Sequence, residues 1–540
     1  MLRWLDGIGA GLASCAVLAL AACGGGGGGY GGGGGGGGGG PPADPTWAAG
    51  VFQPQGNFAA YCQTPRSGND PVSGMPYPDR LGSTVWENHF LRAWTNAYYL
   101  WYSEVTDVNP ATYANRTSQY FGLLKTTALT PSGNPKDKFH FTYGTAAWEQ
   151  LSQAGVQVGY GATWALLATK PPRKALVAYT DPGTPATAAG LNRGAEIVTV
   201  DGVDLVNDNT TAGVNKLNAG LFPAASGEMH TFGVVDTPGA LAHNVVLTAG
   251  AITSTPVQNV KTLDPTKLVG YFLFNDHIAT AESELVAAFT QLQHEGLNNL
   301  TPVTDLVIDL RYNGGGFLDL ASEVAFMVAG PGPTAGKTFE LQSFNSKYTS
   351  ATTNPVTGAP LAPTPFHTMG QNFSVPPATA LPHLDLARVF VLTGPGTCSA
   401  SEAIMNSLRG VGVTVIEIGS TTCGKPYGFY PQDNCGTTYF SIQFKGVNDQ
   451  GFGDYTDGFS PANAVNNVAT PLPGCSVADD FTHQLGDPAE ARVAAALGYL
   501  ATGMCPVPTG MAPPASPLHA DGVIAKPEWL MNRIMRKTVQ

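Results

Sequence analysis

The alternation of strands and helices between residues 270 and 418 constrains the fold more than any other feature. Apolar and β-branched runs recur along this stretch, separated by segments with helical periodicity. The runs lie at 270–274, 306–310, 389–393 and 413–418. Strands that alternate with helices form a largely parallel sheet covered by helices. The sequence therefore predicts an α/β core, which we expect to span residues 256–505.

A strand–turn–helix segment inside this core carries a candidate nucleophile. The strand at 389–393 runs into Gly-Pro-Gly and then into a helix that opens with small hydroxyl residues, among them Ser399. Lys425 returns to the same sheet edge on the loop after the next strand. A neutral lysine can activate a serine, and burial favours the neutral form. The alternative is a surface lysine beside a plain helix cap, in which Ser399 and Glu402 form a capping box.

A second turn rich in glycine follows the strand at 306–310. It reads Asp309-Leu310-Arg311-Tyr312-Asn313-Gly314-Gly315-Gly316 and precedes a helical run. Glycines at a strand-to-helix turn let backbone N–H groups point outward, and a helix N-terminus adds partial positive charge. The turn therefore suits the stabilisation of an oxyanion, although a lone glycine turn is weak evidence.

Together, the 309–316 turn, Ser399-Ala400-Ser401-Glu402 and Gly424-Lys425 resemble the C-terminal-processing, or tail-specific, serine peptidases that use a Ser–Lys dyad. The resemblance covers roughly residues 86–465. It implies a crotonase-like α/β catalytic core that needs no cofactor and acts on polypeptides with accessible C-termini.

The resemblance also implies a role for each matched residue. Ser399 would be the nucleophile, Lys425 the general base and Glu402 the group that orients the lysine. The backbone N–H of Ala400, together with that of Gly315 or Gly316, would form the oxyanion hole.

Residues 151–255 are similar to a PDZ domain in the order of their motifs. Such domains capture extended C-termini by strand addition, and a glycine-containing loop receives the carboxylate. By resemblance, that loop contains Gly159, Tyr160 and Gly161. The alternative is a small β-sandwich that only packs on the core.

The N-terminal part predicts export and anchoring. Residues 1–22 have a positive start and an apolar run too short for a stable span, as in a bacterial signal peptide. Leu20-Ala21-Ala22-Cys23 resembles a lipobox, which implies a lipid on Cys23. The following Gly24 is not the aspartate that retains lipoproteins in the inner membrane, so we expect a periplasm-facing protein on the outer membrane.

Three further segments complete the organisation of the chain. Residues 23–46 form a glycine-rich tether. Residues 47–150 form an aromatic N-terminal helical region, with one long helix expected from Trp86 to Tyr102. Residues 506–540 form a proline-rich tail.

Charge and cysteine content narrow the partners. The net charge of −12, with no basic run, argues against nucleic acid as the main partner. Six of the eight cysteines remain once Cys15 and Cys23 are set aside, and an exported chain permits disulfides. We hypothesise a Cys398–Cys423 bridge, with Cys423–Cys435 as the rival. No CxxC pair occurs, which argues against zinc.

Two other functions compete with a Ser–Lys endopeptidase. One is a Ser–His hydrolase, in which a distant histidine such as His277 or His383 activates Ser399. The other is a non-catalytic peptide-binding lipoprotein that uses only the PDZ-like unit. The presence of Ser399, Lys425 and Glu402 together favours the endopeptidase.

Overall fold

The computed structural model describes residues 40–264, 268–295, 301–465, 468–506 and 533–535. The contacts separate Met1–Gly40 from Pro41–Gln540. The predicted signal segment, Cys23, nearly all of the glycine-rich tract and most of the 506–540 tail lie outside the described residues. In the part of the chain that is described, no helix has the length and apolar character needed to cross a membrane.

Six strands form the central sheet, in the order β12-β13-β14-β18-β19-β26. Their bounds are Val257–Asp264 (β12), Val269–Phe274 (β13), Asp305–Asp309 (β14), Arg388–Thr393 (β18), Thr414–Gly419 (β19) and Gly474–Ser476 (β26). β12 is antiparallel to β13, and every other neighbouring pair is parallel. The four predicted core strands thus lie in one largely parallel sheet, which confirms the expected α/β architecture.

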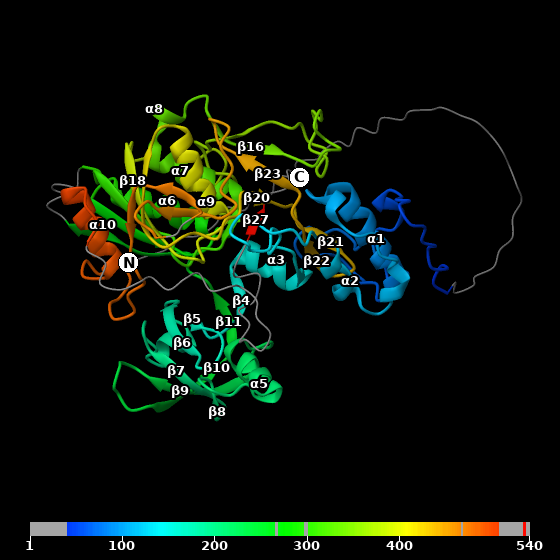
Figure 1. Cartoon of the computed structure of the whole chain (residues 1–540), viewed down its shortest axis with the longest axis horizontal. Helices are drawn as coiled ribbons and strands as arrows, with labels where there is room; N and C mark the ends of the chain where they lie inside the picture. The colour runs from blue at the N-terminus through cyan, green and yellow to red at the C-terminus, as the bar shows by residue number, and fades with distance from the viewer. Residues whose placement is uncertain (1–39, 265–267, 296–300, 466–467, 507–532, 536–540) are drawn as a thin grey trace, which may run out of the picture. The chain divides into compact units, whose positions relative to one another are not determined.

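Helices cover both faces of this sheet (Figure 1). One face packs against α6 (Ala281–Leu292), α7 (Leu318–Ala329) and α9 (Ala400–Gly410), and the other packs against α10 (Ala491–Thr502). Alternate residues serve the two faces: Phe272 joins the first apolar cluster, whereas its neighbour Tyr271 joins the second. Burial on both faces explains why these strands read as continuous apolar runs.

Residues 156–253 build a smaller sheet with an apolar core of its own. Its strands follow the order β10-β9-β7-β6-β5, with β8 paired to β7, and β4 pairs separately with β11. The bounds are Val156–Gly159 (β4), Ala162–Ala168 (β5), Lys174–Thr180 (β6), Glu196–Val200 (β7), Val203–Asp204 (β8), Met229–Val235 (β9), His243–Thr248 (β10) and Gly250–Thr253 (β11), with helices α4 (Pro185–Ala188) and α5 (Thr211–Leu221). β5 ends the order and therefore leaves one edge unpaired within this sheet.

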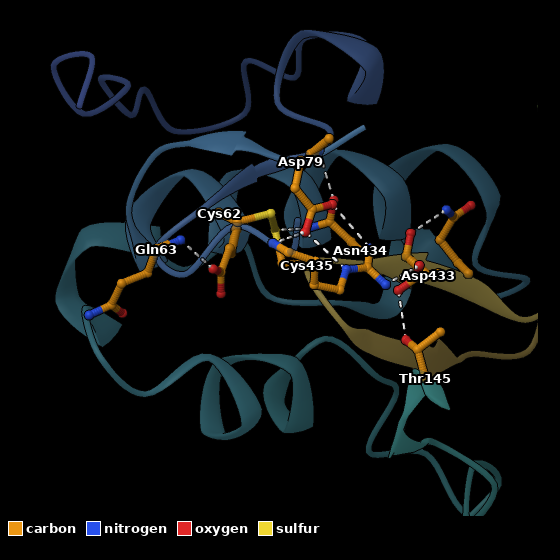
Figure 2. Close-up of a disulfide and its surroundings, with 11 residues drawn as sticks. Cys62, Gln63, Asp79, Thr145, Asp433, Asn434 and Cys435 are labelled. Atoms are coloured by element: carbon orange, nitrogen blue, oxygen red, sulfur yellow. Dashed lines mark hydrogen bonds and ion pairs between the residues drawn. A yellow bond between two sulfur atoms is a disulfide. The ribbon is translucent and has the colours of Figure 1, made fainter. Parts of the chain in front are cut away.

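The N-terminal helical region is joined to the core by a strand and a disulfide. Its helices are α1 (Thr84–Tyr98), α2 (Thr117–Leu123) and α3 (Thr145–Ala154). β3 (Phe141–Gly144) pairs with β22 (Thr437–Phe440), which in turn pairs with β21 (Gln432–Asn434). Figure 2 shows the Cys62–Cys435 disulfide beside Asp433, whose carboxylate accepts the Thr145 hydroxyl at 2.7 Å. Because these links join distant segments, residues 47–150 pack as part of the peptidase-like core.

The first long helix is shorter than expected. α1 ends at Tyr98, whereas the aromatic run predicted a helix to Tyr102. Tyr99 has extended backbone angles, and the Leu100 N–H donates to the Ile442 carbonyl at 2.8 Å. The aromatic residues continue beyond Tyr98, but the Leu100 N–H makes a tertiary hydrogen bond in place of a bond within the helix.

Candidate active site

The two predicted turns follow neighbouring parallel strands. β14 leads into the glycine turn and β18 leads into the serine turn, and the two strands are paired from Val307–Phe390 onward. The Thr397 hydroxyl donates to the Leu310 carbonyl at 2.8 Å, and the Cys398 N–H donates to the Asn313 carbonyl at 3.1 Å. The carboxyl ends of the strands therefore hold both turns against one another, at the crevice where α/β sheets place their sites.

Ser399 occupies a strained position at the start of α9. Its φ of 66° lies in the left-handed region, which a residue with a side chain seldom adopts. The residue is fully buried and forms a capping box with Glu402, as the alternative interpretation expected, although Lys425 is buried and does not lie on the surface. A left-handed conformation at a strand-to-helix turn is typical of the nucleophile position in hydrolases.

Glu402 joins the serine turn to the lysine loop. Its Oε2 accepts the Ser399 N–H at 2.9 Å and the Lys425 N–H at 2.8 Å, so one atom holds both backbones. Its Oε1 accepts the Gly424 N–H at 2.8 Å and the Thr422 hydroxyl at 2.5 Å. Burial raises the pKa of this carboxyl, and the hydrogen bonds only partly oppose that rise. Glu402 therefore orients the lysine loop through the backbone.

Lys425 is fully buried between two aromatic rings. Its Nζ lies 4.2 Å from the centroid of the Phe429 ring and 4.8 Å from that of Phe139. The neighbouring Lys138 donates its ammonium to the Cys423 carbonyl at 2.8 Å, and burial lowers the pKa of Lys138. The N-terminal region thus supplies Lys138 and Phe139 to the base loop, two residues that no sequence motif singled out.

A disulfide links the same two loops. Cys398 and Cys423 are bonded, with their Cα atoms 5.1 Å apart, which confirms the hypothesised bridge. The rival Cys423–Cys435 pairing is wrong, because Cys435 is bonded to Cys62. Cys475 and Cys505 form the third bridge. The bond at 398–423 lies one residue before the candidate nucleophile and two before the candidate base, so it restrains their separation.

The two predicted oxyanion donors of the glycine turn, the N–H groups of Gly315 and Gly316, differ in their contacts. The Gly315 N–H already donates to the Asn313 side chain at 2.9 Å. Gly316 has a φ of 140°, and a Cβ there would lie 2.3 Å from the His277 carbonyl oxygen, so only glycine fits. The Ala400 N–H belongs to the first turn of α9, where N–H groups have no partner within the helix. Ala400 and Gly316 are thus the better placed of the three predicted donors.

The two histidines considered as alternative bases have other contacts. The His277 ring lies 3.0 Å from the Asn313 side-chain oxygen, and its backbone N–H donates to the Gly315 carbonyl. His383 pairs with Asp385 at 3.0 Å, beside the Phe326 ring. These contacts assign His277 to the support of the glycine turn and His383 to the end of a long surface insertion.

Residues of the glycine turn take part in a buried network of ion pairs and hydrogen bonds. Arg311 bonds Asp309 at 2.9 Å and Glu490 at 2.8 Å. Arg193, from the smaller sheet unit, donates to the Tyr312 hydroxyl at 2.7 Å and to Asp479 at 2.7 Å. The candidate oxyanion turn is therefore in direct contact with the 156–253 unit.

The predicted carboxylate-binding loop is ordered by internal contacts. Gly159 ends β4 and pairs with Gly250 of β11. The Tyr160 hydroxyl donates to the Gly220 carbonyl at 2.9 Å, and Gly161 has a φ of 76°. These contacts fix the entry into β5, the edge strand of the smaller sheet.

Comparison with known proteins shows which family this chain resembles. Residues 268–429 match the model of peptidase family S41. A carboxyl-terminal-processing protease from Picosynechococcus sp. is 26% identical over 244 residues, which cover 45% of this chain and 49% of that relative. The alignment therefore spans about half of the relative's length.

One of two similar solved structures supports the fold. A protein from Bacteroides fragilis assigned to the S41 proteases aligns with a TM-score of 0.57 at 21% identity, over 79% of this chain and 98% of that one. A photosystem II D1 C-terminal processing protease aligns with a TM-score of 0.40 at 18% identity, over 71% and 92%. The family match and the curated relative confirm the resemblance to C-terminal-processing serine peptidases, and the first structure confirms the α/β fold.

Proposed function

We propose that this chain is a serine endopeptidase that cleaves polypeptides near their C-termini through a Ser399–Lys425 dyad. The observation that carries the proposal is the shared contact of Glu402 Oε2 with the backbone N–H groups of both residues. The Cys398–Cys423 bond, which joins the same two loops, also supports it. The whole of 256–505 would then form the crotonase-like core.

In the proposed reaction, the Ser399 hydroxyl attacks the carbonyl carbon of the scissile peptide bond while the neutral Lys425 amine takes its proton. The resulting ammonium returns that proton to the leaving amine as the C–N bond breaks, which leaves an acyl ester on Ser399. Water then attacks the ester, with the same amine as base, and releases the acid. Lys425 is fully buried, which is the environment that a lysine base requires.

The negative charge that develops on the carbonyl oxygen needs donors that are already oriented. We assign this role to the N–H groups of Ala400 and Gly316, because the Gly315 N–H is bonded to Asn313. The position of Ala400 at the start of α9 adds the favourable field of the helix N-terminus.

Three substitutions test the dyad. Ser399→Ala and Lys425→Met should each lower turnover of an unfolded protein by at least about 10³-fold, since both remove a group that acts in the bond-making step. His383→Ala serves as the control and should retain turnover. Near-normal activity in Lys425→Met would reject the dyad and favour the histidine mechanism. Peptide binding without any cleavage by the unaltered chain would favour the non-catalytic alternative.

We further propose that residues 151–255 are PDZ-like and capture the substrate's C-terminus. The unpaired edge of β5 supports strand addition, and the loop Gly159–Gly161 leads directly into that edge. A peptide with a free C-terminal carboxylate should bind more tightly than the same peptide with a C-terminal amide. Equal affinities would contradict carboxylate capture.

The site of action proposed from the N-terminal residues is the cell envelope. A lipid on Cys23, followed by the glycine-rich tether, would hold the peptidase at the periplasmic side of the outer membrane. Three disulfides within the described residues support an oxidising compartment.

A further inference from the structure

A segment near the end of the sequence lies on the glycine turn. β15 (Gly315–Phe317) pairs in parallel with β27 (Arg533–Met535), with Gly316 opposite Ile534. β27 also contacts β20 (Tyr427–Gly428), which begins two residues after Lys425. Figure 1 shows β27 beside β20. The segment thus lies between the strand that bears the candidate oxyanion donor and the strand that follows the candidate base.

The direction of the peptide groups in β15 shows which of its backbone N–H and C=O groups face β27. On one side of β15, the Gly315 carbonyl accepts the His277 N–H at 3.1 Å and the Phe317 N–H donates to the His277 carbonyl at 2.8 Å. Neighbouring residues of a strand direct their peptide groups to opposite sides. The N–H and C=O of Gly316 therefore face β27. In parallel register, they meet the carbonyl of Arg533 and the N–H of Met535.

The Gly316 N–H is the donor assigned above to the oxyanion. A carbonyl of the chain itself therefore faces the donor that the proposed mechanism assigns to the substrate carbonyl. We propose that the edge of β15 is the polypeptide-accepting edge of the active site, and that residues 533–535 occupy it as a strand that competes with substrate. The competition with substrate rests on the proposed function, whereas the pairing of β27 with β15 is independent of it.

The occupant fits the edge through backbone groups. Main-chain hydrogen bonds are what strand addition uses to bind diverse sequences, so the same edge accepts a substrate of any suitable extended sequence. Because the segment belongs to the same chain as the core, its pairing with β15 is an intramolecular event. A short strand that would bind weakly as a free peptide can therefore compete in the intact chain.

Met535→Pro and Met535→Ala form the matched pair that tests this inference. Proline removes the N–H that faces the Gly316 carbonyl, whereas alanine keeps it and alters only the side chain. Loss of one backbone hydrogen bond should shift the occupancy of the edge by about 2- to 10-fold. The full chain is used throughout.

Two measurements keep the outcomes separate. Hydrogen exchange on chains that also carry Ser399→Ala reports docking without any catalysis, and exchange of the Gly316 amide should be about 2- to 10-fold faster in Met535→Pro than in Met535→Ala. With Ser399 intact, kcat/KM for an unfolded protein should rise by the same factor.

Each result has one meaning for the inference. Equal exchange in the two variants overturns the docking. Faster exchange with an unchanged kcat/KM, in a chain that does hydrolyse protein, overturns the competition. Faster exchange in a chain that hydrolyses nothing supports the docking and rejects the proposed function instead.

Discussion

Removal of the Cys398–Cys423 disulfide should lower both the stability and the activity of this protein, whereas removal of Cys475–Cys505 should lower the stability alone. The bond closes a sequence separation of 25 residues, and Cys475–Cys505 closes one of 30. The loop-entropy relation gives about 3.5 kcal/mol for the first and about 3.7 kcal/mol for the second. The double variants Cys398→Ala/Cys423→Ala and Cys475→Ala/Cys505→Ala should therefore lose nearly equal free energy of unfolding.

Their activities should differ, because only the first bond joins the loops of Ser399 and Lys425. A displacement of about 1 Å in a catalytic pair can cost about 10²-fold in rate. We expect kcat to fall about 10- to 100-fold in the 398/423 variant and to stay within about 2-fold of the unaltered enzyme in the 475/505 variant. Urea midpoints measure the stability, and initial rates on a labelled unfolded protein measure kcat, at a temperature where both variants remain folded.

The refuting result is specific. If the two double variants have the same kcat while the 398/423 variant shows the expected loss of stability, the bond only stabilises the fold. Glu402 would then be sufficient to position the dyad.

Three further perturbations address charge and location. Glu402→Gln should destabilise the fold by about 2 kcal/mol and lower kcat, since an amide cannot accept all four hydrogen bonds that the carboxylate accepts; unchanged urea midpoints and rates would contradict this. Burial and the nearby Glu282 raise the pKa of Glu323 to about 10, so the stability that this carboxyl contributes is present below about pH 4.5 and is lost as pH rises toward 10. Glu323→Gln should flatten that decline, by about 1.4 kcal/mol for each pH unit, in denaturation curves at pH 6 and pH 9, and parallel curves would reject the assignment. Cys23→Ser should move the protein from the membrane fraction to the soluble periplasmic fraction, and unchanged fractionation would exclude the lipid.

The central sheet was predictable because its signals are local. The four predicted strands, β13, β14, β18 and β19, are buried on both faces, so their apolar runs are continuous and visible without knowledge of their neighbours. The smaller sheet unit and the helices of the core were predictable for a related reason, since periodicity reports the face that an element buries. α1 departs from this rule after Tyr98, because the Leu100 N–H donates to the carbonyl of the distant Ile442 instead of to a carbonyl of the helix.

The candidate site divides in the same way. Ser399, Glu402 and Lys425 could be chosen as candidates from the sequence, because they lie at turns that follow predicted strands. The contribution of Lys138 could not be predicted, because a hydrogen bond from a lysine to a distant carbonyl leaves no pattern in the local sequence.

The sequence by itself determined the class of fold, the two loops and the chemistry that they can carry, because these depend on short-range periodicity and residue type. Only the tertiary structure decided which cysteines bond, since six thiols allow many pairings and only the approach of the 398 and 423 loops selects one. It also decided that one carboxylate oxygen holds both Ser399 and Lys425, and that Arg533–Met535 lies on the glycine turn. Contacts of this kind join residues far apart in the chain, and their existence depends on how the whole fold brings backbone groups together.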